Sequence, residues 1–90
     1  MQLRTDRDLL SFMEELMEYL RTRQELDLAD LLGHANRYRE VSTEEYLNEA
    51  ELALKSVLNH RRRVLSGERE DEIRQVVLQI DEWFRDGGVR

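Results

Sequence analysis

The sequence VSTEEYLNEAELALKSVLNHRRRVLSG, residues 41–67, decides the fold because it opens on the clearest helix start in the chain. The start is a capping box, in which the Ser42 side chain can accept the Glu45 amide and the Glu45 carboxylate can accept the Ser42 amide. Gly67 and the cations at residues 60–63 are typical of a helix end. The stretch therefore predicts a helix of about 23 residues, roughly 34 Å long at 1.5 Å per residue.

Three further helices are predicted from apolar residues at helical spacing, over residues 6–23, 27–39 and 68–86. Proline is absent from the chain, and three of the four glycines fall at expected helix ends. The links between the helices are short, which favours antiparallel neighbours. We therefore expect one all-α domain over residues 1–90, an antiparallel four-helix bundle with a long central third helix.

Composition limits the class of protein to which this 90-residue chain can belong. Hydrophobic residues make up 40% and charged residues 38%, which is too charged for a membrane protein and too apolar for a disordered one. No apolar run approaches the roughly 20 residues that span a bilayer, and the first residues contain no signal-peptide core. Cysteine is absent, which fits the cytoplasm. The net charge of −6 favours basic partners and disfavours nucleic acid.

Catalytic and metal-binding motifs are not evident. Neither His34 nor His60 has a glutamate three residues before it, so the Glu-x-x-His motif of di-iron bundles is missing. Asp30 and His34 are spaced as half a metal site at most. No nucleophile lies in a recognisable context, no glycine-rich phosphate loop is present, and no carboxylate falls within an apolar stripe where burial would raise its pKa. We expect no enzymatic activity, no metal and no cofactor.

Two leucines suggest a surface for a protein partner. Leu52 and Leu78 fall on the otherwise polar faces of the third and fourth predicted helices. A single exposed leucine carries no information, but two on consecutive antiparallel helices could form an apolar centre with a polar rim. The expected rim residues are Glu45, Glu49, Arg63, Asp71, Arg74 and Glu82. A chain this short buries only about 60% of its unfolded surface, so a partner or a second copy would help to stabilise it.

An acidic stripe on the first predicted helix offers a second candidate surface. Glu14, Glu15 and Glu18 lie opposite the apolar face of that helix. The stripe is either a contact for a basic partner or a solvated surface.

The basic cluster His60, Arg61, Arg62 and Arg63 suggests nucleic-acid binding as an alternative function. The three arginines would point about 100° apart on a helix, so they would not form one stripe. A helix-turn-helix needs a recognition helix whose first residues are polar and basic, whereas the long predicted helix begins with acids. The alternative is that these cations compensate the helix dipole and contact the acidic start of the fourth helix.

In size, acidity and helical character the chain is similar to small bacterial immunity proteins that neutralise toxins, and to secretion chaperones and antitoxins. This likeness covers no specific residues, and no site is carried over from it. We expect a small cytoplasmic protein-binding module without enzymatic activity, most concretely an immunity-like or antitoxin-like inhibitor of a basic partner protein. The alternatives are a homodimeric regulatory or scaffold protein and a nucleic-acid binder that uses residues 60–63.

Overall fold

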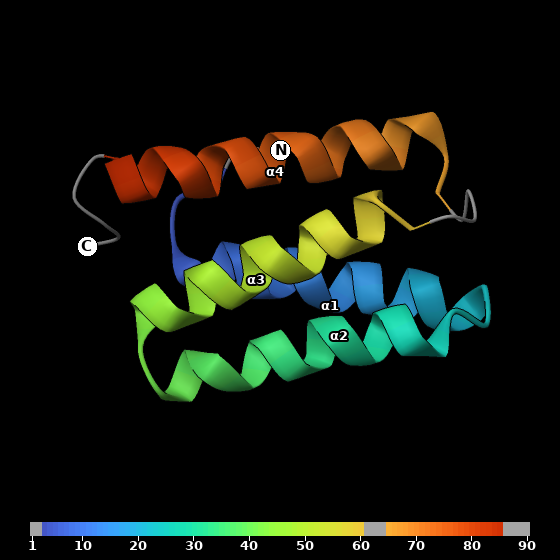
Figure 1. Ribbon diagram of the computed structural model, residues 1–90, viewed down its shortest axis with the longest axis horizontal. Helices are drawn as coiled ribbons and strands as arrows, with labels where there is room; N and C mark the ends of the chain where they lie inside the picture. Colours follow the sequence, from blue (N-terminus) through green and yellow to red (C-terminus); the bar gives the residue numbers. More distant parts are fainter. Residues whose placement is uncertain (1–2, 61–64, 86–90) are drawn as a thin grey trace.

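The described part of the chain is entirely helical. The computed structural model describes residues 3–60 and 65–85, and no strand occurs among them. The elements are α1 (Asp6–Thr22), α2 (Leu26–Arg37), the 3-10 turn η1 (Tyr38–Glu40), α3 (Thr43–Leu58) and α4 (Gly67–Arg85). Figure 1 shows the helices lying along the long axis of the molecule, with α4 at one edge next to α3. The predicted all-α class is confirmed, and the chain is compact, with a radius of gyration of 12.3 Å.

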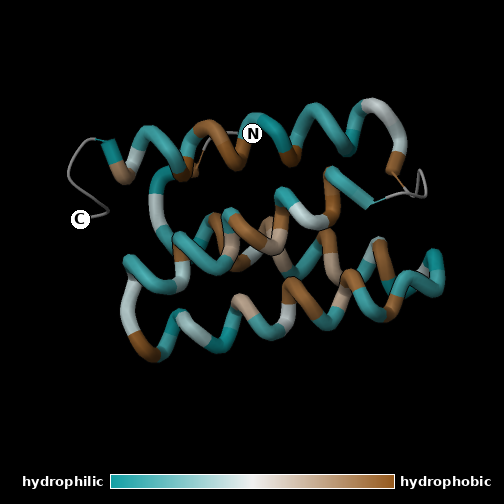
Figure 2. The backbone as a smooth tube through the Cα atoms, viewed as in Figure 1, coloured by the Kyte–Doolittle hydropathy of each residue, from teal (hydrophilic) through white to brown (hydrophobic). Residues whose placement is uncertain are grey.

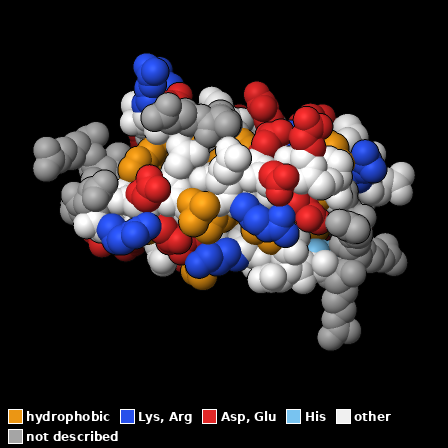
Figure 3. Space-filling model, turned by 90° about the horizontal axis from the view of Figure 1, so that it is seen from above, with side chains coloured by type: hydrophobic (Ala, Val, Ile, Leu, Met, Phe, Trp, Pro, Cys, Tyr) orange, Lys and Arg blue, Asp and Glu red, His pale blue; other side chains and the backbone are white. Residues whose placement is uncertain are grey.

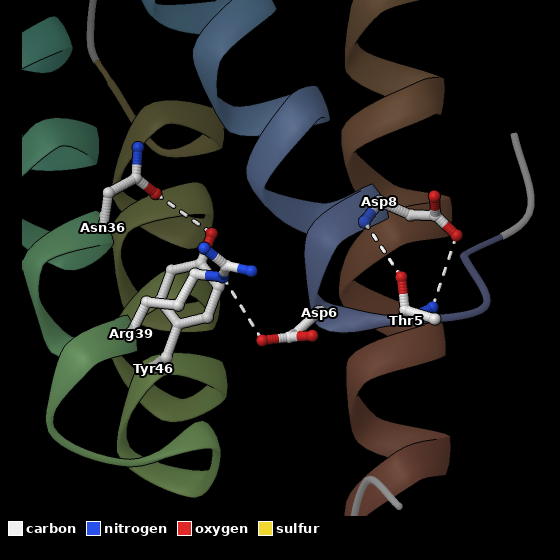
Figure 4. Close-up of polar contacts among 6 residues, drawn as sticks. All are labelled: Thr5, Asp6, Asp8, Asn36, Arg39 and Tyr46. Carbon is white, nitrogen blue, oxygen red and sulfur yellow. Dashed lines mark hydrogen bonds and ion pairs between the residues drawn. The ribbon is translucent and has the colours of Figure 1, made fainter.

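The helix starts differ from the prediction in one respect. At α1 a complete capping box forms, because the Thr5 hydroxyl accepts the Asp8 amide and the Asp8 carboxylate accepts the Thr5 amide (Figure 4). The same carboxylate also accepts the Arg4 amide. At α3 only half of the box forms: the Ser42 hydroxyl accepts the Glu45 amide at 3.0 Å. The reciprocal half is replaced because η1 uses the Ser42 amide, which donates to a backbone carbonyl at the start of that turn.

The prediction of a long third helix is wrong. α3 ends at Leu58 and has 16 residues, fewer than the 17 of α1 and the 19 of α4. Asn59 caps this end, and its amide donates to the Lys55 carbonyl at 3.0 Å. A further turn would carry Arg61 onto the face that buries Val57, and a buried charge is costly. Residues 61–64 lie outside the described part of the chain.

Gly67, which the sequence predicts as the end of the third helix, instead begins the next one. The Ser66 side chain accepts the Arg69 amide at 3.2 Å, as an N-cap does, and Gly67 is the first residue of α4. Leu65, immediately before this cap, is buried in the core. The short connection from α3 is therefore anchored at its far end by an apolar side chain.

Apolar side chains from every α-helix form the core, as the apolar faces predicted for the helices require. Figure 2 shows hydrophobic residues recurring along each helix. The largest fully buried side chains are Leu9, Met13, Leu16, Leu20, Leu32, Tyr46, Leu47, Leu54, Ile73, Val76 and Ile80. Gly33 lies within α2 opposite the Met17 side chain, and a Cβ at this glycine would stand 3.2 Å from the Met17 methyl carbon. The glycine thus allows α1 and α2 to pack closely.

Candidate functional site: the outer face of α3 and α4

The two leucines singled out from the sequence are both exposed. The exposed fraction is 52% for Leu52 on α3 and 57% for Leu78 on α4. Most large apolar side chains of these helices are buried, so the two leucines point away from the core that the helices share. Both leucines lie on the outer face of α3 and α4, which is the candidate site.

A contact between the helices fixes how the two leucines are aligned. The carboxyl group of Glu51 on α3 lies within hydrogen-bonding reach of the Asp81 carboxyl group on α4. Leu52 follows Glu51 in the sequence, and Leu78 precedes Asp81 by three residues. Each leucine therefore lies within about one helical turn of the same contact, which places both at a similar height along the helix pair.

The rim of this face is charged with both signs. Arg74 lies one turn before Leu78 and pairs with Asp71 at 3.4 Å and with Glu70 at 3.5 Å, while Glu82 is exposed one turn after Leu78. On α3, Glu45 is exposed and Glu49 is partly buried. The expected rim residue Arg63 lies outside the described residues. Seen from the α4 side, Figure 3 shows small hydrophobic areas separated by acidic and basic side chains.

A third apolar residue, Phe84, lies near one end of this face, although its helical spacing places it with the apolar residues of α4. Phe84 is 36% exposed and lines a pocket of about 370 Å³ together with Ser42, Glu44, Glu45 and Asn48. The helical spacing of Phe84 was correct, but the residue comes one residue before the end of α4, where the neighbouring helix does not cover it fully. The pocket combines an aromatic ring with two carboxylates, a combination that suits a cationic side chain.

The acidic stripe is exposed but lies on another helix. Glu14, Glu15 and Glu18 are all exposed on α1, and Glu18 pairs with Arg21 at 3.5 Å. An exposed ion pair of this kind contributes little to stability. The acidic stripe and the leucines of α3 and α4 therefore lie on different helices and are treated as two separate candidate surfaces.

The basic cluster is described only at its first residue. His60 is partly buried, and its amide donates to the Val57 carbonyl at 3.3 Å, whereas Arg61, Arg62 and Arg63 lie outside the described residues. A different pair of arginines, missed from the sequence, surrounds Tyr19: the guanidinium carbons of Arg23 and Arg69 lie 4.9 and 4.7 Å from the centre of its ring. The Arg69 contact links the end of α1 to the start of α4, and no local sequence pattern predicts it, whereas Arg23 lies four residues after Tyr19 at the end of the same helix.

A buried tyrosine ties α2 and α3 together. The Tyr46 hydroxyl donates to the Asn36 side-chain oxygen at 3.0 Å, and nearby Arg39 pairs with Asp6 at 3.2 Å (Figure 4). Burial raises the pKa of Tyr46 well above its ordinary value, outweighing the Arg39 charge, which lowers this pKa. The phenol is therefore neutral at physiological pH, and its hydroxyl serves as a structural donor.

One carboxylate contradicts the expectation that none has a pKa raised by burial. The side chain of Glu51 is 14% exposed, and one carboxylate oxygen accepts the Lys55 ammonium at 3.1 Å. The second oxygen is buried without a hydrogen-bond partner. Burial raises the pKa of Glu51, as does its contact with Asp81, against the opposing effect of Lys55. The sequence could not reveal this, because the burial arises from the packing of α4 on α3.

Comparison with protein families, with curated proteins and with solved structures finds no match to this chain. Among the described residues, no group of three or more potential ligands is placed to hold a metal ion. None of the described helices combines the length and apolar character needed to cross a membrane. The functional argument therefore rests on the surface of the molecule.

Proposed function

We propose that this protein is an antiparallel four-helix bundle that binds another protein through the outer face of α3 and α4. The observation that carries the proposal is the exposure of Leu52 and Leu78 beside one interhelical contact. The reversal of direction between successive helices in Figure 1 supports the antiparallel arrangement. Burying the exposed half of two leucines would contribute about 2 kcal/mol to binding, roughly a thirtyfold change in affinity.

The partner that fits this face is a basic protein. The chain carries a net charge of −6, and the pocket beside Phe84 includes the carboxylates of Glu44 and Glu45. Complementary charge speeds association and selects the partner, while burial of the leucines supplies affinity. The most concrete form of the proposal is a cytoplasmic, non-enzymatic inhibitor of a basic protein, resembling immunity proteins and antitoxins in type.

The test replaces the two leucines and compares them with a matched pair elsewhere. Leu52→Asp with Leu78→Asp places charges on the proposed face, and Leu26→Asp with Leu31→Asp places the same charges on exposed leucines of α2. Both double variants are expected to keep the helical circular dichroism signal, because all four side chains lie outside the core. The variants and the wild type then serve as bait in quantitative affinity capture from the native cell.

The expected result is a basic protein that the wild type and the α2 variant retain and that the Leu52/Leu78 variant loses. Its capture should also weaken as salt increases, because the charges at the rim are screened. Equal capture by both double variants would place the interface elsewhere, with the acidic stripe of α1 next in order. Loss of helical signal in the Leu52/Leu78 variant alone would mean that these leucines support the fold.

A homodimeric regulatory or scaffold protein is the second candidate, because the same two leucines would also suit a self-complementary interface. Sedimentation equilibrium distinguishes the two functions. A wild-type dimer that the Leu52/Leu78 variant converts to a monomer supports the homodimer, whereas a wild-type monomer at tens of micromolar rejects it.

A further inference from the structure

The carboxyl group of Glu51 lies at the contact between α3 and α4, where an apolar side chain would be expected. Glu51 follows the buried Ala50 on α3 and contacts Asp81 on α4, and its side chain is 14% exposed. One of its oxygens is buried and has no hydrogen donor. A buried acceptor without a donor is costly, so the contact is incomplete while both acids are ionised.

Binding of one proton would allow a hydrogen bond to form between the two carboxyl groups. Two carboxylates can only accept hydrogen bonds and repel each other, whereas a protonated carboxyl group donates to its neighbour. We propose that Glu51 holds a proton and donates it to Asp81 across the α3–α4 contact, so that the contact is strengthened in acid and weakened when the proton is lost. The pair would thus act as a proton-binding site that makes the packing of α4 sensitive to pH. This inference goes beyond the proposed protein interface, and its test requires no partner.

The charged groups that act on Glu51 come from both helices. Lys55, one turn further along α3, donates to one Glu51 oxygen at 3.1 Å and favours the ionised form. Asp81 on α4 favours the protonated form, as does burial, which is the largest effect. The balance raises the pKa of Glu51 above its ordinary value of 4.5. The ammonium group of Lys55 thus counteracts proton binding without abolishing it.

The direction of the pH dependence follows from this raised pKa. Below its ordinary value of 4.5, Glu51 is protonated in both the folded and the unfolded chain, and its contribution is constant. As the pH rises towards the folded pKa, the unfolded chain releases the proton first, so the folded state loses stability. This loss is complete above the folded pKa, which is the reverse of the usual behaviour of a salt-bridged acid.

The test compares Glu51→Gln with a matched control, Glu82→Gln, which changes an exposed acid beside Asp81. Urea unfolding is followed between about pH 4 and about pH 7. Glutamine removes the titration, so the urea midpoint of Glu51→Gln should rise relative to the wild type as the pH increases. The midpoint of Glu82→Gln should keep a constant offset. A constant or falling offset for Glu51→Gln would overturn the proposal.

A second measurement on the folded protein does not depend on stability. Side-chain carbon resonances followed by NMR should show Glu51 titrating above its ordinary value in the wild type. Asp81→Asn should lower this pKa, because an amide donor replaces a repelling charge, and Lys55→Gln should raise it further. Titration of Glu51 at or below its ordinary value, or the same pKa with and without Asp81, would show that Glu51 holds no proton for Asp81.

Discussion

The hydrogen bond between Tyr46 and Asn36 predicts a measurable coupling between α2 and α3. Tyr46→Phe keeps the buried ring and removes only the hydroxyl, which donates to Asn36 at 3.0 Å. A neutral hydrogen bond contributes about 1 kcal/mol, and water can reach Asn36, which is only partly buried. We therefore expect a loss of about 1 kcal/mol, equivalent to about 4–8 °C in the melting temperature of a domain of this size.

A double-mutant cycle isolates this interaction from other effects of the substitutions. Unfolding free energies of Tyr46→Phe, Asn36→Ala and the double variant, measured in urea, should give a coupling energy of about 1 kcal/mol. The control is Tyr38→Phe, which removes a tyrosine hydroxyl that donates no hydrogen bond among the described residues and should change stability by less than about 0.5 kcal/mol. A coupling energy indistinguishable from zero would refute the structural role of the Tyr46 hydroxyl.

Two further predictions concern stability, both measured as changes in the urea unfolding free energy. Asp8→Ala should cost about 1 kcal/mol more than Glu45→Ala. The reason is that the Asp8 carboxylate accepts two backbone amides, whereas the Glu45 carboxylate accepts none that the structure describes. Equal losses of stability would mean that the α3 capping box is complete in solution. Ile80→Ala should cost about 2–5 kcal/mol, because this fully buried side chain holds α4 on the core, and a midpoint equal to that of the wild type would place Ile80 outside the core.

The helices were predictable because their apolar spacing repeats over several turns. Leu54 and Ile80 fall on the apolar faces of their helices by spacing alone, and both are fully buried. The end of α3 was not predictable in the same way. Gly67 is a strong local stop signal and predicts a longer helix, whereas the helix ends at its cap residue, Asn59. The apolar face could have decided between them, because it is interrupted by Arg61.

Features of the candidate site that depend on a single helix were predictable from the sequence. Features that depend on how two helices pack together were not. The exposure of Leu52 follows from its place on a polar helix face, so the sequence was sufficient. The burial of Glu51 depends on where α4 packs along α3, and the contact of Arg69 with Tyr19 depends on where the start of α4 lies relative to α1. Helical spacing contains no information on that offset between helices.

At the neighbouring residues Glu51 and Leu52, the usual placement of apolar side chains inside and charged side chains outside is reversed. An acid faces the adjoining helix and a leucine faces solvent, although exchanging their environments would satisfy both. Natural chains that depart from a consistent pattern tend to do so at functional sites, where stability is lost for another reason. On α3 this departure coincides with the contact to Asp81 and lies within about one turn of Leu78 on α4. The reversal therefore supports the outer face of α3 and α4, ahead of the acidic stripe on α1, as the first surface to test for partner binding.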